Sequence, residues 1–171
     1  CRGTKTAKAA AYNYQGVPDC GAAKLLQGGP NACKFGCIGF GNCVRACPFG
    51  ALSMGEDGLP VVDKDICTGC GKCADTCPQK IIELVSFEAP VTVSCSSHDK
   101  GGDARKYCKN ACIGCGMCMR NCSHGAIKID KFLAVVDKEI CKECSDPTCL
   151  TKCPTGAIGS LTGKTKEEKS A

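Results

Sequence analysis

The sequence is poor in the side chains that usually form a protein core. It contains no tryptophan, and only 5% of its residues are aromatic. Leu, Ile, Val and Phe together number 31 of 171 residues, which is below the roughly one fifth at which a packed core becomes doubtful. No apolar run approaches the roughly 18 residues of a membrane-spanning helix, and no signal peptide is visible. Stability must therefore come from something besides apolar burial, and disulfides or bound metal are the two candidates.

The chain also lacks the residue patterns of common catalytic sites. Histidine occurs only at His98 and His124, and no acid–base pair, nucleophile arrangement or phosphate-binding loop is present. Gly39-Phe40-Gly41 lies inside a cysteine run, without the strand and helix that flank a dinucleotide-binding loop. Basic residues are not interleaved with aromatic ones, so nucleic-acid binding has little support. We expect neither bond-making catalysis nor an NAD site in this chain.

Cysteine, in contrast, is abundant, with 20 residues in the chain. The cysteines occur in tight runs, three of which end in Cys-Pro, at 47–48, 77–78 and 153–154. Disulfide frameworks scatter their cysteines through the loops of secreted domains. Cysteines three residues apart can instead converge on one metal centre, so the pattern favours bound metal over disulfides.

A repeat with a period of 75 residues organises these runs. CKFGCIGFGNCVRAC at 33–47 aligns with CKNACIGCGMCMRNC at 108–122, except that Phe40 stands where the second copy has Cys115. Cys20 and Cys95 keep the same spacing, and PVVDKDIC at 60–67 resembles AVVDKEIC at 134–141. A period of this length indicates two copies of one module.

The spacing of the runs is that of iron–sulfur proteins. CTGCGKCADTCP at 67–78 has the C-x2-C-x2-C-x3-C-P pattern that binds [4Fe–4S] clusters in bacterial ferredoxins, where the fourth cysteine ligates the other cluster of a pair. Glycines between the ligands, at 69, 71, 114 and 116, let the backbone curl around a cube at positive φ. Zinc sites use distant pairs of C-x2–4-C ligands, which these four runs fit poorly. The sequence therefore predicts [4Fe–4S] clusters.

If the fourth cysteine of each run ligates the other cluster of its pair, sixteen cysteines can be assigned to four clusters. The predicted ligands are Cys33, Cys37, Cys43 and Cys77 for cluster 1; Cys67, Cys70, Cys73 and Cys47 for cluster 2; Cys112, Cys115, Cys118 and Cys153 for cluster 3; and Cys141, Cys144, Cys149 and Cys122 for cluster 4. In cluster 1, Cys33 is predicted to replace the ligand that is missing at Phe40, and Phe40 to shield the cluster from water.

Four cysteines remain, and three interpretations are open for them. They are Cys1, Cys20, Cys95 and Cys108. They are enough for a fifth [4Fe–4S] cluster, which is the interpretation we prefer. They could otherwise form disulfides, although a low-potential protein works in a reducing compartment, or pack as buried thiols. Because Cys108 is the repeat counterpart of Cys33, the division of ligands between clusters stays open.

The expected fold class is small α+β, with tandem bacterial 2[4Fe–4S] ferredoxin-like modules stabilised by their clusters. Short strands are expected at 53–54, 59–62, 128–129 and 133–136, and short helices from Cys43, Cys73, Cys118 and Cys149 to the next cysteine. The expected domains are a basic N-terminal segment at 1–32, a first module at 33–90, a connecting segment with extra cysteines at 91–111, a second module at 112–158 and a flexible polar tail at 159–171.

These motifs, in this order, resemble a known family. GVPDCGAAKLLQGGPNACKFGCIGFGNCVRACPFGAL, VVDKDICTGCGKC and CSSHDKGGDARKYCKNACIGC are similar to the B subunit of the Rnf complex, a membrane-bound, ion-translocating ferredoxin:NAD+ oxidoreductase of anaerobes. The resemblance covers nearly the whole chain except the tail. It implies an electron-transfer subunit on the cytoplasmic face of the cell membrane that accepts electrons from reduced ferredoxin and relays them to other subunits. Ser123 departs from the usual proline after the fourth cysteine, and Lys5 stands where some relatives carry another cysteine.

The chain begins at Cys1 rather than Met, and we expect it to be the soluble part of a longer protein. The resemblance implies an upstream membrane helix and a further iron–sulfur domain, so that membrane association would come only from that segment or from partner subunits. The alternative function is a free-standing polyferredoxin, a diffusible carrier with no fixed partner.

Positive charge is concentrated in the first fifty residues. They hold six Lys and Arg against one acid, whereas the remaining residues hold sixteen of each sign. One interpretation is a docking face for an acidic ferredoxin, because complementary charge speeds encounter. The other is compensation for the clusters, since each oxidised cube with four thiolates carries about −2.

Overall fold

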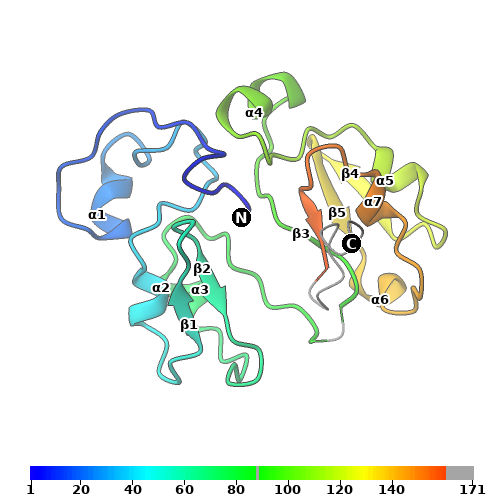
Figure 1. Ribbon diagram of the computed structural model, residues 1–171, viewed down its shortest axis with the longest axis horizontal. Coiled ribbons are helices and arrows are strands. Elements are labelled where there is room, and N and C mark those ends of the chain that lie inside the picture. The colour runs from blue at the N-terminus through cyan, green and yellow to red at the C-terminus, as the bar shows by residue number, and fades with distance from the viewer. Residues whose placement is uncertain (88, 161–171) are drawn as a thin grey trace, which may run out of the picture. The chain divides into compact units, whose positions relative to one another are not determined.

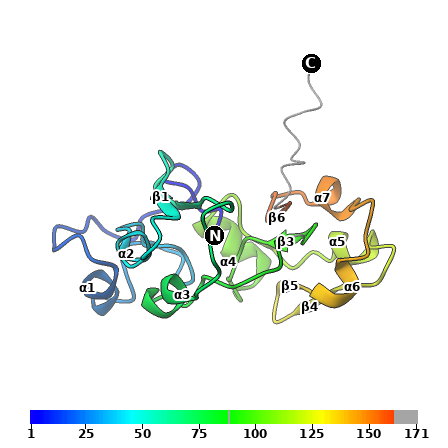
Figure 2. The ribbon, with the colours of Figure 1, turned by 90° about the horizontal axis from the view of Figure 1, so that it is seen from below.

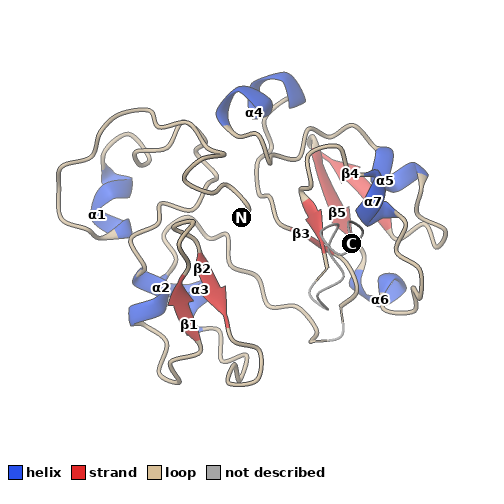
Figure 3. Cartoon of the chain, viewed as in Figure 1, coloured by secondary structure: helices blue, strands red, loops and turns tan. Residues whose placement is uncertain are grey.

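The computed structural model describes residues 1–87 and 89–160, and Figure 1 shows their arrangement. The chain divides into two compact units, Cys1–Leu84 and Val85–Ala171, which we call unit 1 and unit 2. Loops make up much of both units, as Figure 3 shows. Among the described residues, no helix is both long and apolar enough to cross a membrane.

Unit 1 contains three short helices and one strand pair. The helices are α1 (Cys20–Leu25), α2 (Asn42–Arg45) and α3 (Lys72–Thr76), and the strands are β1 (Leu52–Met54) and β2 (Pro60–Val62). The two strands are antiparallel, with Leu52 opposite Val62. Helix α2 lies beside both α3 and β1, as Figures 1 and 2 also show. The packing of α2 on α3 therefore brings the two cysteine runs of this unit together.

Among its described residues, unit 2 also contains a strand pair with a helix before it and a helix after it, and it has two further helices and a second strand pair. Its elements are β3 (Thr92–Val93), α4 (Gly101–Tyr107), α5 (Met117–Arg120), β4 (Ile127–Asp130), β5 (Leu133–Val136), α6 (Lys138–Cys141), α7 (Cys149–Lys152) and β6 (Ile158–Gly159). Strands β4 and β5 form an antiparallel hairpin, and α5 packs against α7 and β4. Strand β3 pairs with β6, so that Thr92 lies opposite Gly159.

The expected strand pairs and helices of the cysteine runs are confirmed. The four expected strands correspond to β1, β2, β4 and β5, and the four expected helices to α2, α3, α5 and α7. The four glycines between the ligands all have positive φ, as predicted. Helices α1, α4 and α6 and the pair β3–β6 were not expected. Gly159, where the predicted tail begins, pairs in β6, and residues 161–171 of that tail lie outside the described residues.

Much of the buried core of unit 2 consists of cysteine. Five predicted ligands are buried together with apolar residues of β4, β5 and β6, and these ligands are Cys112, Cys118, Cys141, Cys149 and Cys153. In unit 1 the buried cluster is smaller and comprises Cys20, Ala23 and Ile38, with Tyr14 and Phe40 packed against it. Because cysteines occupy so many of the buried positions, we expect bound clusters to contribute to the stability of the fold.

Candidate metal centres

The ligands predicted for cluster 3 surround one cavity in unit 2. Cys112, Cys115, Cys118 and Cys153 all line it, together with apolar side chains that include Ile129 and Ile158. Burial raises the pKa of the Cys118 thiol, and the thiols of Cys112, Cys153 and Cys115 raise it further. Four thiols around one largely apolar cavity are the donor set that a [4Fe–4S] cube takes, so these residues fit the group.

The ligands predicted for cluster 4 also lie together. Burial raises the pKa of Cys149 to about 12, and the nearby thiols of Cys122, Cys141 and Cys144 contribute to the rise. Burial likewise raises the pKa of Cys141, with Cys144 and Cys122 adding to the effect. The structure therefore brings the whole predicted set into one neighbourhood.

Three of the four ligands predicted for cluster 2 are close neighbours in unit 1. Burial raises the pKa of the Cys73 thiol, and the thiols of Cys67 and Cys70 raise it further. The fourth, Cys47, lies two residues beyond the end of α2, and α2 packs against the helix that carries Cys73. The fold thus places Cys47 in the neighbourhood of this cluster.

Backbone N–H groups surround the sulfurs of two predicted fourth ligands. Burial acts to raise the pKa of Cys47, but hydrogen bonds from the N–H groups of residues 49–52 outweigh it and lower the pKa. At Cys153, burial is outweighed in the same way by N–H groups of residues 155, 157 and 158 and by the Thr155 side chain, whose Oγ1 lies 3.8 Å from Cys153 Sγ. Donors of this kind stabilise thiolates, the form that binds iron.

The ligands predicted for cluster 1 are partly brought together, with one addition. Burial raises the pKa of Cys43, and the thiols of Cys20 and Cys77 raise it further. The pKa of Cys37 is raised by burial and by Cys20 and Cys43, while the Lys8 ammonium acts in the opposite direction. Cys20, which the sequence assigned to cluster 5, therefore lies near two predicted ligands of cluster 1, Cys37 and Cys43. The role of Cys33, a half-buried residue, stays a prediction.

The remaining candidates for cluster 5 are divided between the units. Cys1 is exposed, and its sulfur accepts a hydrogen bond from the N–H of Gly3 at 3.3 Å. Cys108 is buried directly after α4, and Cys95 lies close enough to Cys112 to raise its pKa, after the larger effect of burial. The structure contains no disulfide among the described residues. A fifth cluster stays a prediction.

Basic side chains of unit 1 reach carbonyl groups at or beside these ligands. Lys8 Nζ donates to the Cys37 carbonyl at 2.7 Å, and Lys24 Nζ donates to that of Pro78, which follows Cys77. Arg45 Nη1 donates to the Phe40 carbonyl at 2.8 Å. The sequence showed these charges only as an excess in the first fifty residues, and their positions depend on tertiary contacts that no local pattern signals.

Comparison with protein families agrees with this chemistry. The model of the 4Fe-4S dicluster domain matches residues 32–81 and 111–157, and a second dicluster domain model matches residues 59–123. Together the first two stretches contain the ligands predicted for clusters 1 to 4.

Relatives of known function belong to redox complexes. The B subunit of the proton-translocating ferredoxin:NAD(+) oxidoreductase complex of Clostridium ljungdahlii is 52% identical over 96% of this chain and 58% of its own length. The B subunit of the Na(+)-translocating ferredoxin:NAD(+) oxidoreductase complex of Acetobacterium woodii is 42% identical over 92% of this chain and 47% of its own length. The B subunit of the ion-translocating oxidoreductase complex of Methanosarcina acetivorans is 44% identical over 92% of this chain and 59% of its own length.

These similarities confirm the resemblance that the motifs indicated, and the chain spans about half the length of those relatives. The family matches cover more than half of the chain and coincide with the thiol groups that the fold assembles. By sequence and by the arrangement of its cysteines, the chain belongs to the 4Fe-4S dicluster domain family.

Proposed function

We propose that this chain is an electron-transfer part of an ion-translocating ferredoxin:NAD+ oxidoreductase. It would accept electrons from reduced ferredoxin and relay them to other subunits, at the cytoplasmic face of the cell membrane. The observation that carries the proposal is the cavity of unit 2, which four thiols line. The names of its relatives, which are B subunits of ferredoxin:NAD(+) oxidoreductase complexes, supply the electron donor and the assembly.

Different groups of residues have different roles in the proposed electron transfer. When bound, [4Fe–4S] clusters supply one-electron redox chemistry. The cysteine thiolates hold the iron, with the sets predicted for clusters 2, 3 and 4 as the proposed ligands. N–H groups around Cys47 and Cys153 stabilise negative charge on sulfur, and apolar residues such as Ile129 and Ile158 limit water around the cavity of unit 2.

The basic side chains of unit 1 contribute mainly to charge compensation in this proposal. Lys8, Lys24 and Arg45 donate to internal carbonyls near the predicted ligands. A cation held beside a site that gains negative charge on reduction stabilises the reduced state. Lys34 likewise donates to the Gln27 carbonyl. Arg2 and Lys5, which are exposed, are the candidates for a surface that an acidic ferredoxin approaches.

The test begins with iron and acid-labile sulfide per chain in protein prepared without air. Reduction of the same protein by stoichiometric reduced ferredoxin is then followed by stopped-flow absorbance. We expect iron and sulfide in equal amounts, and bleaching of the visible absorbance within the mixing experiment. Zinc in place of iron, or an iron protein that ferredoxin does not reduce, would overturn the proposal.

A second experiment separates this function from that of a free-standing polyferredoxin. Tagged chain is incubated with detergent extracts of membranes from a cell that contains the complex, and bound proteins are identified. We expect co-purification of other subunits of the oxidoreductase. A chain that exchanges electrons with ferredoxin but retains none of these subunits would favour the diffusible carrier.

A further inference from the structure

The position that lacks a cysteine in the first copy is built like its counterpart in the second. Gly41 and Gly116 precede α2 and α5 with φ of 71° and 70°. Arg45 donates to the carbonyl of Phe40 at 2.8 Å, and Arg120 donates to the carbonyl of Cys115 at 3.2 Å. From residue 40 onward the backbone therefore follows a similar local path in both copies.

The Phe40 side chain packs against the segment that carries Cys20. Its ring lies 5.4 Å from that of Tyr14, centroid to centroid, and both rings pack on the buried cluster of Cys20, Ala23 and Ile38. Cys20 is only 8% exposed. The residue that stands in place of a ligand is thus in the same small apolar group as an additional cysteine.

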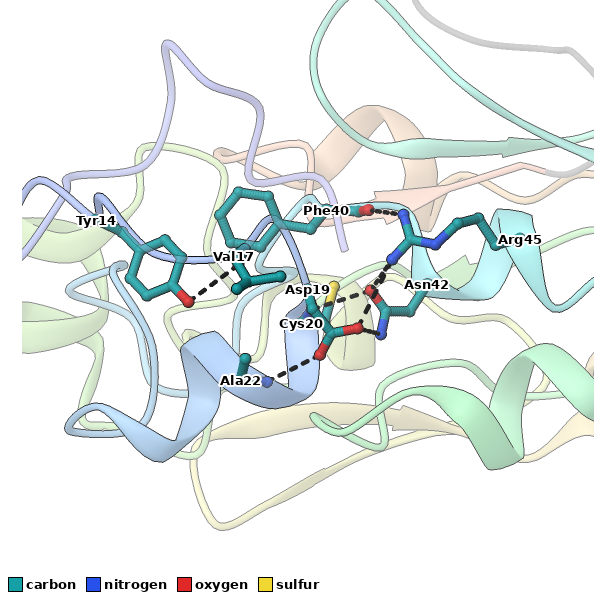
Figure 4. Close-up of polar contacts among 8 residues, drawn as sticks. All are labelled: Tyr14, Val17, Asp19, Cys20, Ala22, Phe40, Asn42 and Arg45. Carbon is teal, nitrogen blue, oxygen red and sulfur yellow. Dashed lines mark hydrogen bonds and ion pairs between the residues drawn. The ribbon is translucent and has the colours of Figure 1, made fainter.

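A network of hydrogen bonds fixes Cys20 relative to α2, as Figure 4 shows. Asn42 Oδ1 accepts from the Cys20 backbone N–H at 2.9 Å, and Asn42 Nδ2 donates to Asp19 Oδ2 at 2.6 Å. Arg45 Nη2 donates to the same Asn42 oxygen at 2.8 Å. Because Asn42 and Arg45 flank Cys43 in α2, the network holds the start of α1 next to a predicted ligand of cluster 1.

Four thiols are thereby brought into one region. Cys20 packs with Ile38, which follows Cys37, and its N–H donates to Asn42, which precedes Cys43. Cys77 directly follows α3, which packs on α2. The thiol of Cys20 also adds to the rise of the pKa of Cys37 and of Cys43, after the larger effect of burial. Three of the four, Cys37, Cys43 and Cys77, are the predicted ligands of cluster 1 that remain because Phe40 replaces the middle cysteine of the run. A cube needs four thiolates, and the fourth thiol in this group belongs to Cys20.

We propose that Cys20 is the fourth ligand of the cluster that Cys37, Cys43 and Cys77 hold, in place of the ligand lost at Phe40. The proposal rests on the iron–sulfur function proposed above, and it assigns to Cys20 the role that the sequence had suggested for Cys33. Cys33 then takes no part in this cluster.

The second copy has a counterpart of this arrangement. Cys95 is 75 residues after Cys20 and lies near Cys112. Burial raises the pKa of Cys112, and the thiol of Cys95 raises it further. There the middle cysteine of the run, Cys115, is present and lines the cavity itself. The equivalent thiol is therefore placed near the cluster in both copies, but only the first copy needs it as a ligand.

The test compares Cys20→Ala with the matched variant Cys33→Ala, each prepared without air. Iron content, acid-labile sulfide and electron paramagnetic resonance spectra are measured, with far-UV circular dichroism as a check of folding. We expect Cys20→Ala to lose about four iron atoms or to show the signal of a three-iron cluster. Full iron content and unchanged spectra in Cys20→Ala would overturn the proposal.

Restoring the missing ligand gives the decisive measurement. Phe40→Cys is introduced into both alanine variants, so that the first copy regains the cysteine pattern of the second. We expect it to restore the four-iron cluster in the Cys20→Ala background and not to correct any loss in the Cys33→Ala background. Restoration in the Cys33→Ala background, or its failure in the Cys20→Ala background, would overturn the proposal. Reduction of the unmodified protein by ferredoxin is measured separately and tests only the proposed function.

Discussion

At the scale of single residues, hydrogen-bond donors determine how much negative charge a sulfur can hold. The Cys153 sulfur accepts hydrogen bonds from backbone N–H groups and from the Thr155 hydroxyl. The Cys122 sulfur accepts one from the N–H of Ala126 at 3.3 Å. Reduction adds negative charge to a cluster and its ligands, so each donor favours the reduced form and raises the reduction potential.

Removal of the Thr155 hydroxyl tests this effect with little change of shape. We expect Thr155→Val to lower the potential of the cluster held by Cys153, by at most about 40 mV if the lost hydrogen bond is worth about 1 kcal/mol. A potentiometric titration followed by electron paramagnetic resonance measures it. Thr151→Val is the control, because the Thr151 hydroxyl donates to the carbonyl of Thr148. A potential that is equal in the two variants would contradict the prediction.

Two glycines between predicted ligands differ in how closely the neighbouring backbone approaches them. A Cβ on Gly114 would lie 2.7 Å from the Phe132 carbonyl oxygen, whereas a Cβ on Gly69, at the same place in another run, would meet nothing within 4 Å. Both glycines have positive φ, at 62° and 68°. The two positions therefore share a backbone strain but differ in contact.

Alanine at these two positions separates strain from contact. Gly69→Ala should cost about 1–2 kcal/mol, the usual penalty for an L-residue at positive φ. Gly114→Ala should cost about 1–3 kcal/mol more, because the backbone of Phe132 must shift. Denaturant midpoints for loss of visible absorbance measure the difference, and equal midpoints would show that the contact at Phe132 is relieved without cost.

At the scale of elements, the sequence predicted those that the repeat and the cysteine spacing define locally. The pairs β1–β2 and β4–β5 were expected because apolar residues flank a turn in each copy. Helix α1 was not expected, although Asp19 caps it locally by accepting from the Ala22 N–H. The N–H of Cys20 at its start also donates to Asn42, which is more than twenty residues away. The counterpart of Asn42 in the second copy is Met117, so the repeat does not predict the hydrogen bond between Asn42 and Cys20.

The same reasoning explains which ligands the sequence placed well. The ligand sets of clusters 3 and 4 were predicted from cysteine spacing and from the exchange of fourth ligands within a pair. The fold brings each set together. The neighbourhood of Cys20 depends on α1 docking on α2, a tertiary contact. Two sequence signals pointed towards it: the absent cysteine at Phe40 and the constant spacing of Cys20 and Cys95.

Asn42 is the residue through which α1 and α2 are joined. We expect Asn42→Ala to destabilise unit 1 by about 1–3 kcal/mol, because the Cys20 N–H loses its acceptor and Asp19 loses one of its donors. The denaturant midpoint for bleaching of visible absorbance should fall accordingly. Asn121→Ala is the control, since Asn121 makes an exposed contact with the Met117 carbonyl. A smaller effect at Asn42 than at Asn121 would count against the link.

At the scale of the whole molecule, the clusters take the place of an apolar core. The buried cluster of unit 1 has only three members, and large apolar side chains such as Leu25, Phe49 and Val61 are exposed. The burial of so few apolar groups in unit 1 leaves little to offset the conformational entropy of the chain. We therefore expect folding to be coupled to cluster binding.

Removal of iron by a chelator under reducing conditions tests this coupling. We expect the iron-free chain to be largely unstructured by far-UV circular dichroism, and to regain structure when iron and sulfide are returned. A cooperative thermal transition in the iron-free chain would mean that apolar packing suffices.

The pairing of β3 with β6 has a consequence for how the protein is made. Strand β6 is the last described element, and it closes unit 2 against a strand 67 residues earlier. Unit 1 can be complete when residue 84 has left the ribosome, but unit 2 also needs Cys153 and residues 158–159. At about 5–20 residues per second, this is a delay of roughly 4–15 s. During that interval the cysteines of 112–118 have no Cys153 to complete their set, so we expect the cluster predicted for Cys112, Cys115, Cys118 and Cys153 to form only after residue 153 has emerged.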